Sequence, residues 1–167
     1  MYDTSKQNID PHTARIDYIA GLVTDMLEDR VPSGERIWAA SHLFGVADHA
    51  ALLAGMRAQN IELAYIAGLM HDLYKFTTGN VERHAEEGAA FARPLLEKSG
   101  LFSAKEIETI CGAIYYHSDK AHRHLPFDEI LKDADVMQTV LSSGTRVVSK
   151  KQSERWKSLK KEFGFKP

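Results

Sequence analysis

Cysteine is nearly absent from this chain, which has one among its 167 residues. Cys111 has no second thiol with which to pair, so an intrachain disulfide and a zinc site built from cysteines are both excluded. Any metal that the protein binds must therefore be held by nitrogen and oxygen atoms. Eight histidines and 23 acidic residues are available to supply them.

A strong charge of one sign and a long hydrophobic run are also missing. The net charge is -2, with 26% charged and 44% hydrophobic residues, which is the composition of an ordinary globular protein and disfavours nucleic acid as a partner. The first eight residues contain no apolar signal core, and no stretch approaches the roughly 20 apolar residues of a membrane span. We therefore expect a cytoplasmic protein that does not enter the membrane.

Several catalytic signatures are absent as well. The sequence has no GxxxxGK[ST] phosphate loop, no GxSxG elbow, no HExxH helix and no alternating strand pattern of useful length. Apolar residues instead recur at helical spacing along most of the chain. These patterns predict one all-α domain over residues 1–167, a bundle of about six or seven helices.

Capping and breaking residues predict where the helices begin and end. Asp10-Pro11 begins the first helix, Asn60 caps the third, and Ser103 with Glu106 has the spacing of a capping box. We expect residues 75–79 to form a loop, after which Asn80 caps the next helix. A second loop covers residues 118–126, and Asp128 caps the helix that Ser142 and Gly144 interrupt. The basic segment 146–163 predicts a last helix with a solvated charged face.

Side chains suited to metal binding follow the apolar run 61–70. His71 and Asp72 end that run, His42 lies 29 residues upstream, and Asp135 lies 63 residues downstream of Asp72. Imidazole suits iron, zinc, nickel and copper, whereas carboxylate suits manganese and magnesium. The mixed set predicts one or two catalytic divalent ions, iron or manganese first, with nickel, cobalt, zinc or magnesium as alternatives.

The order of His42, then His71-Asp72, then Asp135 resembles the HD-domain superfamily of metal-dependent phosphohydrolases. The resemblance implies that these four residues are metal ligands and that Asp72 can bridge to a second ion. Asp133 competes with Asp135, because two residues separated by one position on a helix point about 200° apart and only one can face the site. The family pattern favours Asp135, although periodicity leaves the choice open.

His84 and His117 extend the likeness. The segments 84–88 and 113–117 resemble those of the dinuclear YqeK-like group, which implies that both histidines are further metal ligands. The alternative for His84 is a polar residue near the start of a helix.

Basic residues near these positions are candidates for phosphate binding. Lys75 lies one helical turn after Asp72, and Lys120, His122, Arg123 and His124 follow His117 in a loop. A solvated lysine and an exposed loop are the alternatives. In the resemblance, Asp72 and Lys75 are the catalytic candidates, with Asp72 bridging the ions or accepting a proton from water.

The resemblance implies hydrolysis of a phosphomonoester or phosphoanhydride. We expect a small phosphorylated partner, a nucleotide in particular, and a homodimer is compatible with the sequence. An HD-type di-iron oxygenase that acts on a small organic substrate uses the same ligands and is the alternative function. A non-catalytic binding module with a structural metal is a third.

Overall fold

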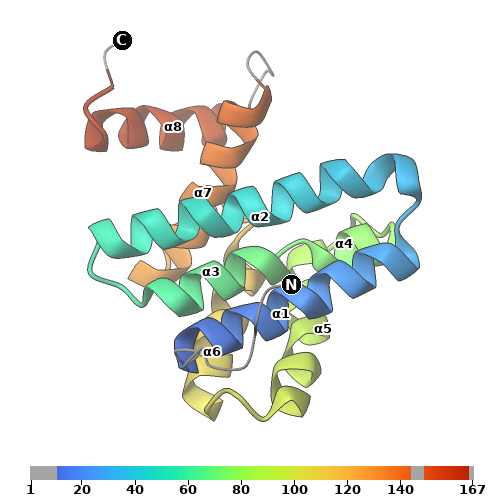
Figure 1. The fold of residues 1–167 in the computed structure, drawn as a ribbon. Helices are drawn as coiled ribbons and strands as arrows, with labels where there is room; N and C mark the ends of the chain where they lie inside the picture. The colour runs from blue at the N-terminus through green and yellow to red at the C-terminus, as the bar shows by residue number, and fades with distance from the viewer. Residues whose placement is uncertain (1–10, 144–148, 166–167) are drawn as a thin grey trace, which may run out of the picture.

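The computed structural model describes residues 11–143 and 149–165. These residues form eight helices and no strand, so the expected all-α fold is confirmed (Figure 1). Seven of the helices have ten residues or more, and α4 is a single short one. The bounds are α1 Pro11–Arg30, α2 Ser33–Met56, α3 Ile61–Met70, α4 Leu73–Thr78, α5 His84–Ser99, α6 Ala104–Tyr116, α7 Pro126–Ser143 and α8 Lys150–Glu162.

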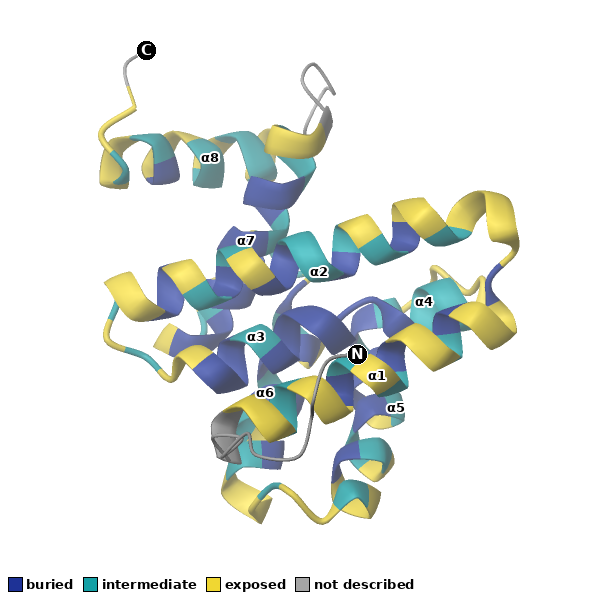
Figure 2. Ribbon diagram, in the orientation of Figure 1, coloured by how far each residue is buried: buried dark blue, intermediate teal, exposed yellow. Residues whose placement is uncertain are grey.

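The short helix α3 lies at the centre of the bundle. It contacts α1, α2, α6 and α7, and eight of its ten residues are buried. Figure 2 shows the contrast with α1 and α8, whose outer faces are exposed. An apolar helix buried on nearly every side needs no amphipathic pattern. The C-terminal end of α3, where His71 follows, is therefore placed deep in the protein.

Helices α2 and α3 pack with their backbones unusually close. A Cβ atom at Gly68 would lie 2.5 Å from the Cα atom and 2.7 Å from the nitrogen atom of Ala47, which is nearer than real Cβ contacts come. Only a glycine allows this approach. Because His42 is on α2 and His71 follows α3, the distance between the two helices also sets the distance between the two imidazoles.

Two of the expected caps are present in the structure. The Asn60 side chain accepts a hydrogen bond from the Leu63 amide, and Ser103 and Glu106 form a reciprocal capping box. The structure also begins the first helix at Pro11, whereas Asp10 and Gly144 lie outside the described residues.

Other expected boundaries were wrong. Residues 75–79 are not a loop, because α4 runs to Thr78 and ends at Gly79, which takes a left-handed φ of 72°. Asn80 does not cap α5; its side chain accepts from the Glu82 amide two residues on, and α5 begins only at His84. At Asn80 the local turn thus uses the side-chain oxygen that a helix cap would have used.

The start of α7 also differs from expectation, because the helix begins at Pro126 and not after Asp128. Proline is suited to the first position of a helix, and the Asp128 carboxylate accepts a hydrogen bond from the Leu125 amide just before it. The last helix begins at Lys150. The part of the predicted basic segment before residue 149 lies outside the described residues.

Helix α2 is long and apolar enough to cross a bilayer, judged by length and composition alone. This corrects the expectation that no stretch approaches a membrane span. A core helix of a globular protein meets the same criterion, and α2 buries one face against α3 and α7.

Gly68→Ala should lower the free energy of unfolding by about 1–3 kcal/mol or more, because the added methyl group meets backbone that cannot rotate away. Gly21→Ala on α1 is the matched control. Nothing lies within 4 Å of a Cβ atom there, so the change should stabilise the helix by about 0.5–1 kcal/mol. Denaturant unfolding of the two variants checks the prediction, and equal stability would mean that α2 and α3 do not pack as described.

Candidate metal centre

Six helices bring the predicted metal ligands together at a cavity of about 570 Å³, which five of the six ligands line and behind which His71 is fully buried. His42 comes from the middle of α2, His71 and Asp72 connect α3 to α4, and His84 begins α5. His117 follows α6, and Asp135 lies on α7. The structure thus collects residues that are up to 93 positions apart in the sequence, from 42 to 135.

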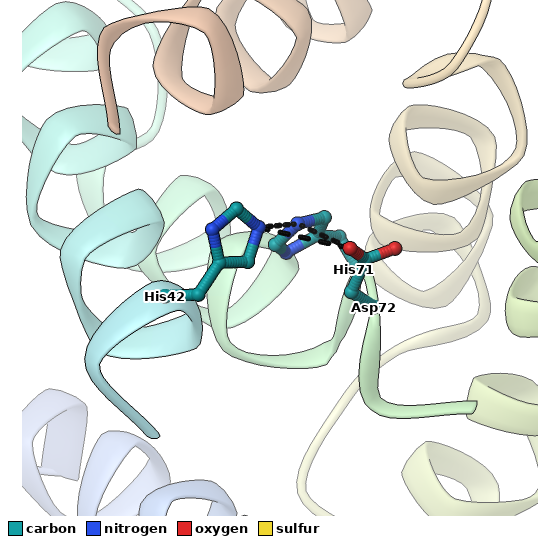
Figure 3. A group of neighbouring side chains, drawn as sticks. All are labelled: His42, His71 and Asp72. Atoms are coloured by element: carbon teal, nitrogen blue, oxygen red, sulfur yellow. Dashed lines mark hydrogen bonds and ion pairs between the residues drawn. The ribbon is translucent and has the colours of Figure 1, made fainter. Parts of the chain in front are cut away.

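The Asp72 carboxylate lies in the middle of four imidazoles. Its Oδ2 atom is 3.6 Å from Nε2 of His42 and 3.7 Å from Nε2 of His71. Its Oδ1 atom is 3.5 Å from Nε2 of His84 and also 3.5 Å from Nε2 of His117. Two groups that could each hold a metal ion therefore share this one aspartate. Figure 3 shows the first group, in which His42, His71 and Asp72 point toward one another.

Backbone carbonyl groups orient three of the histidines. The Nδ1 atoms of His71, His84 and His117 lie 2.7, 3.0 and 2.6 Å from the carbonyl oxygen three residues earlier in each case. A carbonyl oxygen can only accept, so each Nδ1 atom must carry the hydrogen. In a neutral ring held in this way the lone pair is on Nε2, and a second-shell hydrogen bond of this kind is typical of metal-bound histidine.

The protonation states suit metal binding. Burial lowers the pKa of His71 to about 3, in spite of the neighbouring Asp72 carboxylate, and burial also lowers the pKa of His42. Both rings are therefore neutral at pH 7. Burial alone would raise the pKa of Asp72, but His71, His117 and Lys75 hold it well below its usual value.

One carboxylate oxygen provides a direct test of whether a metal fits. Oδ1 of Asp72 is buried and has no hydrogen-bond partner within the described part of the chain, although it faces two imidazoles. A buried anionic oxygen without a donor is costly, and so are lone pairs that face it. A divalent cation between these atoms would satisfy all of them, so the residues present fit a metal.

Asp135 and Asp133 face different cavities. Oδ1 of Asp135 is 3.5 Å from Nε2 of His42, and its Oδ2 accepts a hydrogen bond of 2.7 Å from Lys120. Burial would raise the pKa of Asp135, but the Lys120 ammonium keeps it well below the usual range. Asp133 instead pairs with Arg57 and Arg155, each at 2.8 Å. The structure therefore brings Asp135 to the candidate metal centre and leaves Asp133 outside it.

Two of the predicted phosphate-binding cations line this cavity. The Lys75 ammonium forms an ion pair with Oδ2 of Asp72, and Lys120 binds both Asp135 and the His117 carbonyl oxygen. The unexpected helix α4 places Lys75 there, because it continues the turn that begins after Asp72.

The other three predicted residues of the basic loop lie elsewhere, because none of them lines the metal cavity. The His122 side chain is 78% exposed and bonds to Asp119. His124 stacks on Tyr116, and both Arg123 and His124 line a second cavity. Side chains that are adjacent in a loop can point in different directions, because the backbone angles change from one residue to the next.

Sequence reasoning missed several residues that line the cavity, two of which lie against predicted ligands. Trp38 stacks on the His42 ring at a centroid distance of 5.9 Å, and the Ser118 hydroxyl lies 2.9 Å from Nε2 of His84. Both were within reach of a sequence argument. Trp38 is four positions before His42 on one helix, and Ser118 directly follows His117.

Residues 39–140 match the family model described as the HD domain. The chain belongs to the HD domain family. All six predicted ligands of this HD domain lie inside the matched region, whereas α8 lies outside it. No curated protein matches the chain.

A similar fold occurs in a crystal structure described as a predicted HD superfamily hydrolase from an uncultured Thermotogales bacterium. The two share 22% sequence identity with a TM-score of 0.56, over 86% of this chain and 88% of the other. At this identity the likeness concerns the fold.

Metal content tests the predicted ligands. Purified without a chelator, the HD domain protein should hold two divalent transition-metal ions per chain, because six ligands exceed what one ion with an open position needs. His84→Ala and His117→Ala should each reduce this to one ion, and His122→Ala, outside the cavity, should retain two. Elemental analysis measures the outcome. One ion in all four proteins would remove His84 and His117 from the site.

Substitution of the two aspartates of α7 distinguishes a metal ligand from an ion-pair partner. Asp135→Asn should abolish metal-dependent activity, because it neutralises a predicted ligand. Asp133→Asn should retain the metal but lower the free energy of unfolding by about 1–3 kcal/mol, since two arginines lose a charged acceptor. Metal analysis and denaturant unfolding of both variants decide the matter. Loss of metal in Asp133→Asn alone would reverse the assignment.

Proposed function

We propose that this protein is a metal-dependent phosphohydrolase that cleaves a phosphomonoester or phosphoanhydride of a nucleotide. The observation that carries the proposal is that four imidazoles and the carboxylates of Asp72 and Asp135 meet at one cavity, where Lys75 and Lys120 pair with the two carboxylates. Membership of the HD domain family and the fold shared with a predicted HD superfamily hydrolase support it.

The predicted ligands divide into two sets around Asp72. His42 and His71 lie on the Oδ2 side with Asp135 next to His42, and His84 and His117 lie on the Oδ1 side. A bound divalent ion in such a site lowers the pKa of water and polarises a phosphoryl oxygen. Iron or manganese is the proposed metal, and the six-residue set supports a kinship with the dinuclear YqeK-like group.

The chain's own cations suit an anionic substrate. Lys75 and Lys120 each pair with a carboxylate that the proposal assigns to the metal, so their ammonium groups are directed at the reacting centre. In that position they can bind phosphoryl oxygens and stabilise charge that develops on them. These lysines favour hydrolysis of a phosphate ester over the oxygenase alternative, because an anionic phosphate gains more from nearby ammonium groups than an uncharged organic substrate does.

Trp38 supports a nucleotide as the substrate. Its indole lines the cavity while 52% of the residue remains exposed, so a face is available for a nucleobase to stack on. The proposed partner is thus a small phosphorylated molecule. The cytoplasmic location and the homodimer remain expectations from the sequence.

An anaerobic assay tests the proposal directly. Mononucleotides, dinucleoside polyphosphates and guanosine tetraphosphate are each offered with manganese, iron, cobalt, nickel or magnesium, and release of phosphate or nucleotide is measured. Hydrolysis needs no dioxygen, so turnover should persist. If none is cleaved while the reduced iron form consumes dioxygen with a small organic substrate, the oxygenase reading replaces this one.

Lys75→Ala should lower turnover of the cleaved substrate by about 10- to 100-fold and leave the metal content intact, because it removes a charged contact to phosphate. Lys98→Ala, an exposed lysine at the far end of α5, is the control and should behave as the unaltered protein. Steady-state kinetics and elemental analysis are the measurements. Unchanged kinetics would return Lys75 to the class of solvated lysines, and loss of metal would indicate a structural role.

A further inference from the structure

Arg155 of α8 is tied to three different parts of the protein. Its Nε atom donates to the Lys120 carbonyl oxygen at 3.0 Å, and its two Nη atoms donate to Asp133 at 2.8 Å and to Glu129 at 2.9 Å. The side chain is only 12% exposed. The expected solvated face of the last helix is therefore interrupted by a partly buried guanidinium that makes three charged or polar bonds.

The residue that Arg155 holds is one of the cations that line the metal cavity, which are Lys75, Lys120 and Lys151 of α8. Lys120 donates from Nζ to Asp135 at 2.7 Å and to the His117 carbonyl oxygen at 2.6 Å, and its side chain is 9% exposed. Its backbone belongs to the segment between α6 and α7, where the Lys120 amide donates to the Ser118 carbonyl oxygen at 2.9 Å in a turn outside both helices. Arg155 supplies a bond at the carbonyl oxygen of that same residue.

Lys132 binds the segment between α6 and α7 two residues after Lys120. Lys132 of α7 is fully buried and donates to the His122 carbonyl oxygen at 3.0 Å, as well as to Glu129 at 2.8 Å. Glu129 also accepts from Arg155, so the two cations share one acceptor. Lys132 acts two residues beyond Lys120, and Arg155 acts on Lys120 itself.

We infer that Arg155 is a positioning residue for the reaction, one that holds Lys120 in the metal cavity and so makes α8 a part of the catalytic site. The inference rests on the proposed function. A lysine side chain loses up to about 2 kcal/mol of rotamer entropy when it is fixed, and a mobile backbone adds to that cost. Anchoring the backbone of Lys120 before substrate binds removes part of the cost from the reaction.

Arg57 of α2 distinguishes positioning from simple attachment of α8. It binds Asp133 at 2.8 Å and Glu162 of α8 at 2.7 Å, so it too fastens α8 to the bundle. Unlike Arg155, it makes no bond to the Lys120 segment among the described contacts. Arg57→Gln should therefore loosen α8 while leaving Lys120 in place.

The variants to compare are Arg155→Gln, Arg155→Lys and Arg57→Gln, with Arg93→Gln as a surface control that removes an exposed pair with Glu108. Arg155→Lys keeps a charge for the carboxylates but cannot also reach the Lys120 carbonyl oxygen, so it serves if Arg155→Gln does not fold. Both Arg155 variants should lower kcat about tenfold with unchanged metal content, and the two controls should stay within about twofold. Equal losses in Arg155→Lys and Arg57→Gln would overturn the inference.

A double-mutant cycle with Lys120→Met tests whether Arg155 acts through Lys120. If it does, the double variant should be no slower than Lys120→Met alone, because the positioned group is already missing. Multiplication of the two separate losses would show that Arg155 acts elsewhere, and the positioning role would be withdrawn.

Chemical reactivity of Lys120 gives a readout that does not depend on turnover. Reductive methylation of the purified protein, followed by peptide mass spectrometry, should modify Lys120 several-fold faster in Arg155→Lys than in the unaltered protein or Arg57→Gln. Lys132 should stay protected in all of them. A protein that cleaves no phosphate but shows this change refutes the proposed function alone, whereas an unchanged Lys120 rate refutes the positioning role.

Discussion

The buried carboxylate of Asp72 imposes the constraint on which the rest of the structure depends. An anionic group removed from water needs partners of matching charge or hydrogen-bonding capacity, and its Oδ1 atom finds none within the described residues. Four imidazoles surround it, and the backbone turns three of them so that the free nitrogen faces inward. Helix ends, loops and cations around the cavity are arranged about this one charge.

Close packing of backbones makes that arrangement possible. Gly68 lets α3 approach α2 at Ala47. Gly68 is three residues before His71, and Ala47 is five residues after His42. Gly88 plays a related part on α5, where a Cβ atom would lie 3.3 Å from the His71 carbonyl oxygen. The small residues sit one or two turns from the ligands, so the packing of α2, α3 and α5 also sets the span of the metal cavity.

The site combines two kinds of support. Regular helices hold His42 and Asp135, and His71 directly follows α3, so the positions of all three follow from helix packing. Lys120 instead lies in the irregular segment between α6 and α7, where Lys132 of α7 binds the His122 carbonyl oxygen and Arg155 of α8 binds the Lys120 carbonyl oxygen. The ion pairs of Arg155 with Asp133 and Glu129 thus connect α8 with α7, next to the metal cavity.

The order of His42, His71-Asp72 and Asp135 indicated the family, and the helical spacing of apolar residues indicated the all-α fold. Both can be read from the sequence because they depend on the order and spacing of residues along the chain. The Asn60 and Ser103 caps were also readable, since their hydrogen bonds span three residues. Only the tertiary structure decided that Asp135 and not Asp133 faces the cavity, that His122, Arg123 and His124 lie outside it, and that Arg155 binds the Lys120 carbonyl oxygen. The physical reason is that these side chains are directed by partners distant in sequence, whose positions no local spacing encodes.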